Sequence, residues 1–314
     1  MVKSEAVTDY AAKRKKLWTE ERRAYLVLVA PSVLLYIAVL AFPILFSLFL
    51  SMIDYTGSGA IFSPSTQITF VGFTHFSEMF KDSFFWLALK NNFLIVFISV
   101  FGQIPLGFIL AYILYRRLVR APGFFQTVIY LPAVISTIVI GVLWSSFFSA
   151  YGPVTKMVQY FIPRWENTLK LDSNLAMFPV LFAILWAYTG IYLIIFLANL
   201  QKIEPEIIES AKIDGASEGR VIRHIILPAL SGVVMTSAIL AIAGSLNSFA
   251  LIWAMTQGNP AQATSVMAIY MYRKAYAGAV DLPFANAISM FIVALSFVMI
   301  VMTRAVEKRF GGRD

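Results

Sequence analysis

Long apolar stretches separated by short polar segments make up most of this chain. Six stretches of membrane-spanning length contain no Asp, Glu, Lys or Arg, and they cover residues 24–53, 91–115, 121–155, 173–201, 224–272 and 282–303. A bilayer core about 30 Å thick needs roughly 20 mostly apolar residues for each helical crossing. The pattern therefore predicts an all-α membrane protein built from transmembrane helices.

The fifth stretch is long enough for two crossings, but its second half is interrupted. The turn-rich run 256–264 divides it, and Arg273 follows too soon for another helix to cross. We therefore expect six transmembrane helices. Their approximate bounds are 24–52, 87–115, 124–149, 174–200, 226–255 and 283–303.

The basic residues test this count independently, because Lys and Arg collect on cytoplasmic loops. With both termini inside, the inner segments 1–23, 116–120, 202–223 and 304–314 carry 18 of them. The outer loops carry 6, and Lys90 lies at a membrane boundary. An odd number of crossings would put one basic terminus on the wrong side. The charge pattern therefore predicts six crossings with both termini cytoplasmic.

The composition supports a membrane protein and argues against several other classes. Hydrophobic residues make up 59% of the chain and charged residues 13%, against roughly 45–50% and about 25% in soluble domains. The net charge of +8 comes from residues that flank the spans, so the expected partner is a lipid bilayer and not a nucleic acid. With no cysteine there is neither a disulfide nor a thiolate metal site. His75 and His224 are isolated, so we expect no metal site and no catalytic pair.

The most informative polar segment is the loop 201–225, between the fourth and fifth spans. Pro205 suits the first turn of a helix, where its missing N–H is no loss. Gly215 suits the left-handed residue that ends a helix. We therefore expect a helix over 205–213 and a second helix from about Ser217.

The expected first helix carries an apolar stripe. Ile203, Ile207 and Ala211 are four residues apart and therefore share one face. A short helix of this kind, held between two spans, is suited to dock into a groove on a soluble partner. The residues alone fit a helix lying on lipid headgroups equally well.

This segment resembles the signature loop of importer permeases of the ATP-binding-cassette (ABC) class. Their pattern is Glu-Ala-Ala, two residues, Asp-Gly-Ala, then a hydrophobic run that ends in Leu-Pro. Here residues 209–216 read Glu-Ser-Ala-Lys-Ile-Asp-Gly-Ala, and residues 225–228 read Ile-Ile-Leu-Pro. The resemblance implies that the loop contains the coupling helix, which fits a cleft on the ATPase subunit. The residues that it assigns to coupling are Glu209, Ala211, Asp214, Gly215 and Ala216.

Two further stretches narrow the resemblance. Residues 131–144, with 151–154, look like the third span and outer loop of maltose-type and glycerol-phosphate-type permeases. Residues 249–264 look like their motif after the fifth span, which usually reads Thr, any residue, Gly-Gly-Pro. Asn259 stands at the second glycine, and asparagine also tolerates positive φ.

The resemblance implies an architecture and a function. A six-span permease domain over 24–303 would lie between a cytoplasmic N-terminal segment, 1–23, and a cytoplasmic tail, 304–314, in a bacterial or archaeal inner membrane. It would import a sugar or oligosaccharide from an extracytoplasmic binding protein. Its other partners would be a second, related permease chain and two ATPase subunits.

No enzymatic activity or cofactor is expected in this chain. It has no Gly-x-x-x-x-Gly-Lys-[Ser/Thr] loop, so ATP and Mg should bind the partner ATPase subunits. A permease for another polar solute, such as glycerol 3-phosphate, is an alternative. An ion-driven carrier usually has an ionisable residue within a span, and here only Lys90 and Arg304 lie at span ends. A membrane-embedded enzyme would need a central catalytic group, and the spans offer no carboxylate or cysteine.

Polar and aromatic residues within the spans are candidates for the substrate path, since aromatic faces and hydrogen-bonding side chains bind sugars. These candidates are Asn247, Ser248 and Trp253 in the fifth span, Asn286 and Ser289 in the sixth, and Trp144, Tyr188 and Tyr192 in the third and fourth. Small and polar residues also pack spans together, and aromatic residues near span ends anchor the interface. The sequence leaves both alternatives open.

Overall fold

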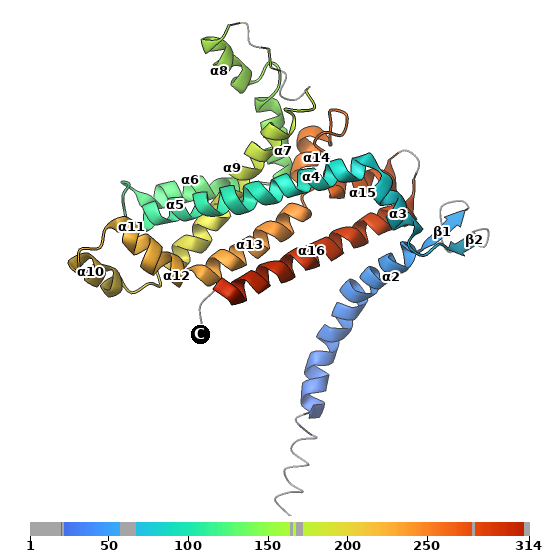
Figure 1. Cartoon of the computed structure of the whole chain (residues 1–314), viewed down its shortest axis with the longest axis horizontal. Helices are drawn as coiled ribbons and strands as arrows, with labels where there is room; N and C mark the ends of the chain where they lie inside the picture. Colours follow the sequence, from blue (N-terminus) through green and yellow to red (C-terminus); the bar gives the residue numbers. More distant parts are fainter. Residues whose placement is uncertain are drawn as a thin grey trace, which may run out of the picture.

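The computed structural model describes residues 20, 22–56, 67–163, 166–167, 172–277 and 280–310. Most of the N-terminal segment 1–23 and the last four residues of the tail lie outside this part of the chain. Four of the described helices are long and apolar enough to cross a membrane: Arg22–Leu50, Ser83–Tyr115, Met177–Leu200 and Leu282–Lys308. Two bent helix pairs pass the same test, so the described residues hold four to six crossings. The all-α membrane architecture is confirmed (Figure 1), and the count is six if each bent pair is one crossing.

The elements follow in chain order, with π-helical turns labelled η. The first half contains η1 (Ile37–Ala41), α2 (Phe42–Leu50), β1 (Ile53–Thr56), β2 (Gln67–Phe70), α3 (Thr74–Lys81), α4 (Ser83–Ile98), η2 (Ser99–Gln103), α5 (Ile104–Tyr115), α6 (Pro122–Val134), α7 (Thr137–Phe147) and α8 (Pro153–Phe161). The second half contains α9 (Met177–Leu200), α10 (Pro205–Ile213), α11 (Glu218–Val221), η3 (Ile222–Ile226), α12 (Leu227–Ala229), α13 (Ser231–Leu246), α14 (Ala250–Thr256), α15 (Met267–Tyr276) and α16 (Leu282–Phe310).

Each of the three described π-helical turns ends two residues before a proline. Pro43 follows η1, Pro105 follows η2 and Pro228 follows η3. A proline has no N–H to donate, and its ring clashes with the carbonyl four residues earlier. The turn before it widens, and the next N–H bonds the carbonyl five residues back, as Ile104 N does to Ser99 O. The helix therefore continues through Pro43 and Pro105, whereas after Pro228 it ends at Ala229, and α13 starts at Ser231 with a bend of 68°.

The third predicted span, 124–149, is not a single straight helix. It consists of α6 and α7, whose axes meet at 99°. Ile135 and Ser136 adopt extended backbone with ψ of 145° and 129°, and Pro132 removes one donor from the last turn of α6. A run of apolar residues without charges therefore contains a sharp corner.

The fifth predicted span, 226–255, is also interrupted, because α13 ends at Leu246. The side chains of Asn247 and Ser248 donate to the carbonyls of Ala243 and Gly244 on their own helix, which competes with the backbone. Asn92 Nδ2 reaches across from α4 and donates to Ser245 O at 2.9 Å. The chain then turns and starts α14. At the other end of the sequence, α16 runs on to Phe310, seven residues past the predicted sixth span.

Glycines let the central helices approach closely. A Cβ on Gly107 of α5 would lie 2.6 Å from Tyr192 Cβ of α9. A Cβ on Gly190 of α9 would lie 2.5 Å from the carbonyl oxygen of Ile129 of α6. Small residues at helix crossings are typical of membrane bundles, and α9 is thereby packed against two neighbours at once.

The bundle has two distinct ends (Figure 1). The end of α5, the short helices α10 and α11, and the C-terminal end of α16 lie at one end. The β1–β2 hairpin, which pairs Ile53 with Phe70 and Thr56 with Gln67, lies at the other end with α3 and α15. The helix Arg22–Leu50 projects away from the bundle, and none of its most apolar 18-residue window is buried.

Candidate functional site

The loop between α9 and α11 folds as its sequence predicts. The helix expected over 205–213 is present as α10, with Pro205 in its first turn. It ends at Gly215, which has φ of +80°. Gly215 N bonds Lys212 O and Ala216 N bonds Ala211 O, at 3.0 and 2.9 Å. These two bonds form a Schellman motif, which requires a left-handed residue at this position.

The face that α10 presents differs from the predicted stripe. Ile208 is only 4% exposed and packs into the core, and Ile203 and Ala211 are half-buried against the same cluster. Ile207 and Ile213 are 48% and 87% exposed. The predicted stripe is therefore not one exposed face, since Ile203 and Ala211 are half-buried against the bundle and only Ile207 is exposed.

The polar coupling candidates lie on the exposed side of this loop. Glu209, Asp214 and Gly215 are exposed, and Ala216 is half-buried against the core cluster. Within the described residues, neither carboxylate of Glu209 and Asp214 forms an ion pair. Both groups are therefore open to a partner on the side where Ile213 projects.

A charged cluster ties this loop to the bundle. The carboxylate of Glu218 on α11 lies 2.9 Å from Arg116 Nε, just after α5, and 3.1 Å from Lys212 Nζ on α10. The Tyr112 hydroxyl donates a hydrogen bond to the same carboxylate. That bond and the two cations hold the pKa of Glu218 below its ordinary value. Three separate segments thus meet on one carboxylate.

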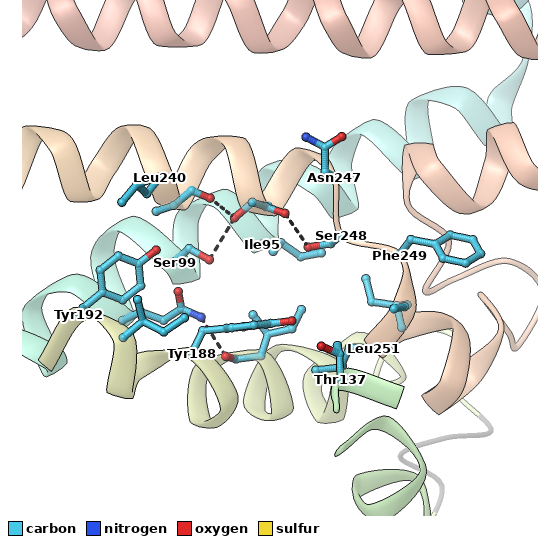
Figure 2. A pocket seen from close by; sticks show the side chains of 18 residues that line it. Ile95, Ser99, Thr137, Tyr188, Tyr192, Leu240, Asn247, Ser248, Phe249 and Leu251 are labelled. Atoms are coloured by element: carbon cyan, nitrogen blue, oxygen red, sulfur yellow. Dashed lines mark hydrogen bonds between the residues drawn. The ribbon is translucent and has the colours of Figure 1, made fainter. Parts of the chain in front are cut away.

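A cavity of about 410 Å³ lies between α4, α9, α13 and α14 (Figure 2). Sites for small molecules have volumes of roughly 300–1,000 Å³. Its walls combine apolar side chains with uncharged polar ones. The polar members are Ser99, Gln103, Thr137, Tyr188, Tyr192, Ser245, Asn247 and Ser248. The break at 247–249 forms one end of the cavity, so the interruption of the fifth span helps to shape it.

Comparisons with known proteins identify this architecture. The family described as "Binding-protein-dependent transport system inner membrane component" matches residues 103–312, which is more than half of the chain. The chain belongs to this family. The permease is therefore the membrane component of an ABC importer, a non-catalytic subunit that works with a binding protein and with a separate ATPase.

Two named relatives and one solved structure show how far the similarity extends. The lactose transport system permease protein LacF of Rhizobium radiobacter is 31% identical over 86% of this chain and 89% of that protein. The sn-glycerol-3-phosphate transport system permease protein UgpA of Shigella flexneri is 32% identical over 76% of this chain and 81% of that protein. A chain of a bacterial ABC transporter involved in the import of the acidic polysaccharide alginate shares the fold. Its TM-score is 0.77 at 23% identity, covering 95% of this chain and 100% of that chain.

Four of the eight path candidates line the cavity of the permease: Tyr188, Tyr192, Asn247 and Ser248. Figure 2 shows both tyrosines on the α9 side, whereas the Asn247 amide points away from them, across α13. Trp253 lies elsewhere, against Tyr272 with ring centroids 4.8 Å apart. The cavity is therefore polar mainly through tyrosines, serines and one glutamine.

The other three candidates hold helices together. Asn286 accepts a hydrogen bond from Ser47 at 2.6 Å and so joins α16 to α2. Ser289 donates to the Met271 sulfur of α15. Trp144 packs on Phe182 of α9, with ring centroids 5.0 Å apart. These three side chains make packing contacts between helices, and none of them lines the cavity.

Sequence reasoning left several polar cavity residues out of its candidates, among them Ser99 and Gln103 on η2. Gln103 is 2% exposed as a residue and donates from Nε2 to Ile184 O at 2.8 Å. The hydroxyls of Ser99 and Ser245 lie 3.1 Å apart, within hydrogen-bond distance. The available signal is that these polar residues, with Asn91 and Asn92, interrupt an otherwise apolar span. Their position four residues apart on the cavity side became clear only from the packing.

The motif after the fifth span forms a closed loop. The hydroxyls of Thr256 and Thr264 are 2.7 Å apart, and Asn91 Nδ2 donates to the carbonyl of Ala263 at 2.8 Å. Positive φ occurs at Gln257 and Gly258 but not at Asn259. Asn259 therefore does not adopt the positive φ that asparagine was expected to tolerate in place of the family's second glycine.

Proposed function

We propose that this permease moves a sugar or oligosaccharide from an extracytoplasmic binding protein into the cytoplasm of a bacterium or archaeon. The observation that carries the proposal is the cavity in which Tyr188 and Tyr192 lie beside uncharged hydrogen-bonding groups. Aromatic rings and neutral polar groups together match a sugar's apolar faces and hydroxyls. The name of the lactose permease, a relative at 31% identity, supports the same substrate class.

The orientation follows from the ends of the bundle. The basic segments 116–120, 202–223 and 304–310 lie at one end (Figure 1). The positive-inside rule places this end in the cytoplasm, which supports six crossings with both termini inside. The β1–β2 hairpin and α15 would then face the binding protein.

The exposed side of α10 is the proposed contact for the ATPase. Ile207 and Ile213 offer apolar side chains and Glu209 a free carboxylate, on a helix that Ile208 anchors to the bundle. Two ATPase subunits would then require two such loops, so a second, related permease chain would complete the transporter.

The docking claim is tested with the complex of permease chains, ATPase and binding protein in proteoliposomes. Ile213→Asp should release the ATPase during purification and reduce ATP-driven sugar uptake at least tenfold, because a charge replaces the most exposed apolar side chain of the contact. Ile162→Asp is the matched control, since Ile162 is 55% exposed just after α8, in a different part of the fold. An Ile213→Asp complex that keeps its ATPase and its uptake would disprove this contact.

A further inference from the structure

The cavity of the permease has no charge of its own. None of the 18 residues that line it is Asp, Glu, Lys, Arg or His. We propose that the substrate is an uncharged saccharide and that carboxylated or phosphorylated sugars are rejected at this cavity. The inference rests on the proposed function. It narrows the substrate class, since the names of similar proteins include both neutral and anionic substrates.

The stretches of the surrounding helices beside the cavity carry no charge either, and Lys90 on α4 is exposed and lies five residues before the lining residue Ile95. Between Lys90 and Arg116 the wall formed by α4, η2 and α5 contains no charged residue. The same holds for α9, between Asp172 and Lys202. A substrate in the middle of these helices therefore meets only neutral groups of this chain.

The neutral groups suit hydroxyls better than anions. Ser245 donates its one hydroxyl proton to Ala241 O at 2.7 Å, and Gln103 uses one of its two N–H donors on Ile184 O, so most of this donor capacity is already used within the protein. The hydroxyls of Tyr188 and Tyr192 have no hydrogen-bond partner among the described residues. A phenol both donates and accepts, as a sugar hydroxyl does, whereas a carboxylate or phosphate oxygen only accepts. The cavity therefore offers few free donors to an anion.

Helix ends do not make up for the missing cation. Thr137 begins α7 and lines the cavity, so the N-terminal end of that helix lies beside the cavity. A helix N-terminus carries only about half an elementary charge, and its effect fades within one turn. A full negative charge taken out of water needs a close partner of opposite sign. The uncharged groups that line the cavity therefore favour an uncharged ligand.

The inference is tested by comparing uptake of uncharged and anionic saccharides of matched length by the reconstituted complex with its binding protein. The uncharged compounds should be taken up at least tenfold faster. Faster uptake of uronate-containing or phosphorylated compounds would overturn the inference and leave the proposed function standing. Uptake of no saccharide at all would overturn both.

A pair of variants tests the role of this chain separately from the binding protein. Ser248 lines the cavity and is half-buried. Ser248→Lys and Ser248→Glu should reduce uptake by similar factors, relative to Ser248→Asn, which adds bulk without charge. If the substrate were anionic, the Lys variant would retain uptake and the Glu variant would abolish it. That result would overturn the inference. ATP hydrolysis by each purified complex checks that the variants assemble.

Discussion

Gly190 sets how closely α6 and α9 approach. An added Cβ would meet two backbone atoms, Ile129 O at 2.5 Å and Tyr130 Cα at 2.8 Å, and backbone cannot move aside as a flexible side chain can. Gly190→Ala should therefore destabilise the permease by about 1–3 kcal/mol, as overpacked interiors do. Thermal unfolding of the purified complex measures this. Gly232→Ala is the control, because its Cβ would meet nothing within 4 Å. Equal melting of the two variants would contradict the close packing.

Single residues differ in how much of their role the sequence reveals. Pro205 and Gly215 follow local backbone rules, so the start and end of α10 were predicted correctly. Asn286 and Ser289 follow no such rule, because a polar residue in a membrane helix suits both packing and a substrate path. Only the neighbouring helix decides between them, and here that neighbour is α2 for one and α15 for the other.

At the scale of elements, Glu218 positions α10. Its carboxylate joins Arg116, Lys212 and Tyr112, and a neutral or shortened side chain would lose the ion pairs. We expect Glu218→Ala to loosen α10, with faster hydrogen exchange over 205–213 and less substrate-stimulated ATP hydrolysis. Glu206→Ala, which removes an exposed carboxylate from the same helix, is the control.

The same cluster has a defined pH response. The pKa of Glu218 is lowered from its ordinary value of 4.5, mainly by the hydrogen bond from Tyr112. A carboxylate with a lowered pKa stabilises the fold fully above its ordinary pKa, and that contribution is lost as the pH falls through the lowered value. The exchange difference between wild type and Glu218→Ala should therefore persist at neutral pH and disappear under strongly acidic conditions. A difference that disappears above pH 4.5 would contradict this assignment.

The elements themselves were predictable from length and hydropathy where each is straight. The helix Met177–Leu200 follows its charge-free stretch closely, and Leu282–Lys308 starts with its own stretch and runs past the end of it. The corner between α6 and α7 and the end of α13 were not predictable. The corner depends on the extended backbone at Ile135 and Ser136, and the end of α13 depends on a contact between helices, the bond from Asn92 of α4 to the carbonyl of Ser245. A hydropathy pattern records neither.

At the scale of the whole molecule, the orientation can be read directly because the chain contains no cysteine. Lys81→Cys, at the exposed end of α3, should react with a membrane-impermeant maleimide in intact cells. Lys202→Cys, beside α10, should react only after the membrane is permeabilised. Each variant is the control for the other, and labelling of position 202 from outside would reverse the proposed topology.

The π-helical turn at η2 makes the cavity sensitive to the length of the chain as well as to its composition. A π turn accommodates one residue more than the regular helix around it. Deleting a single residue from 99–103 would let the helix become regular, and the parts before and after the turn would keep their relative facing because the turn holds the extra residue. Only the side chains within the turn, among them Ser99 and Gln103, would change the direction in which they point. Homologous chains that lack one residue here should therefore expose different side chains to their substrates at this turn, while the rest of the cavity wall stays in place.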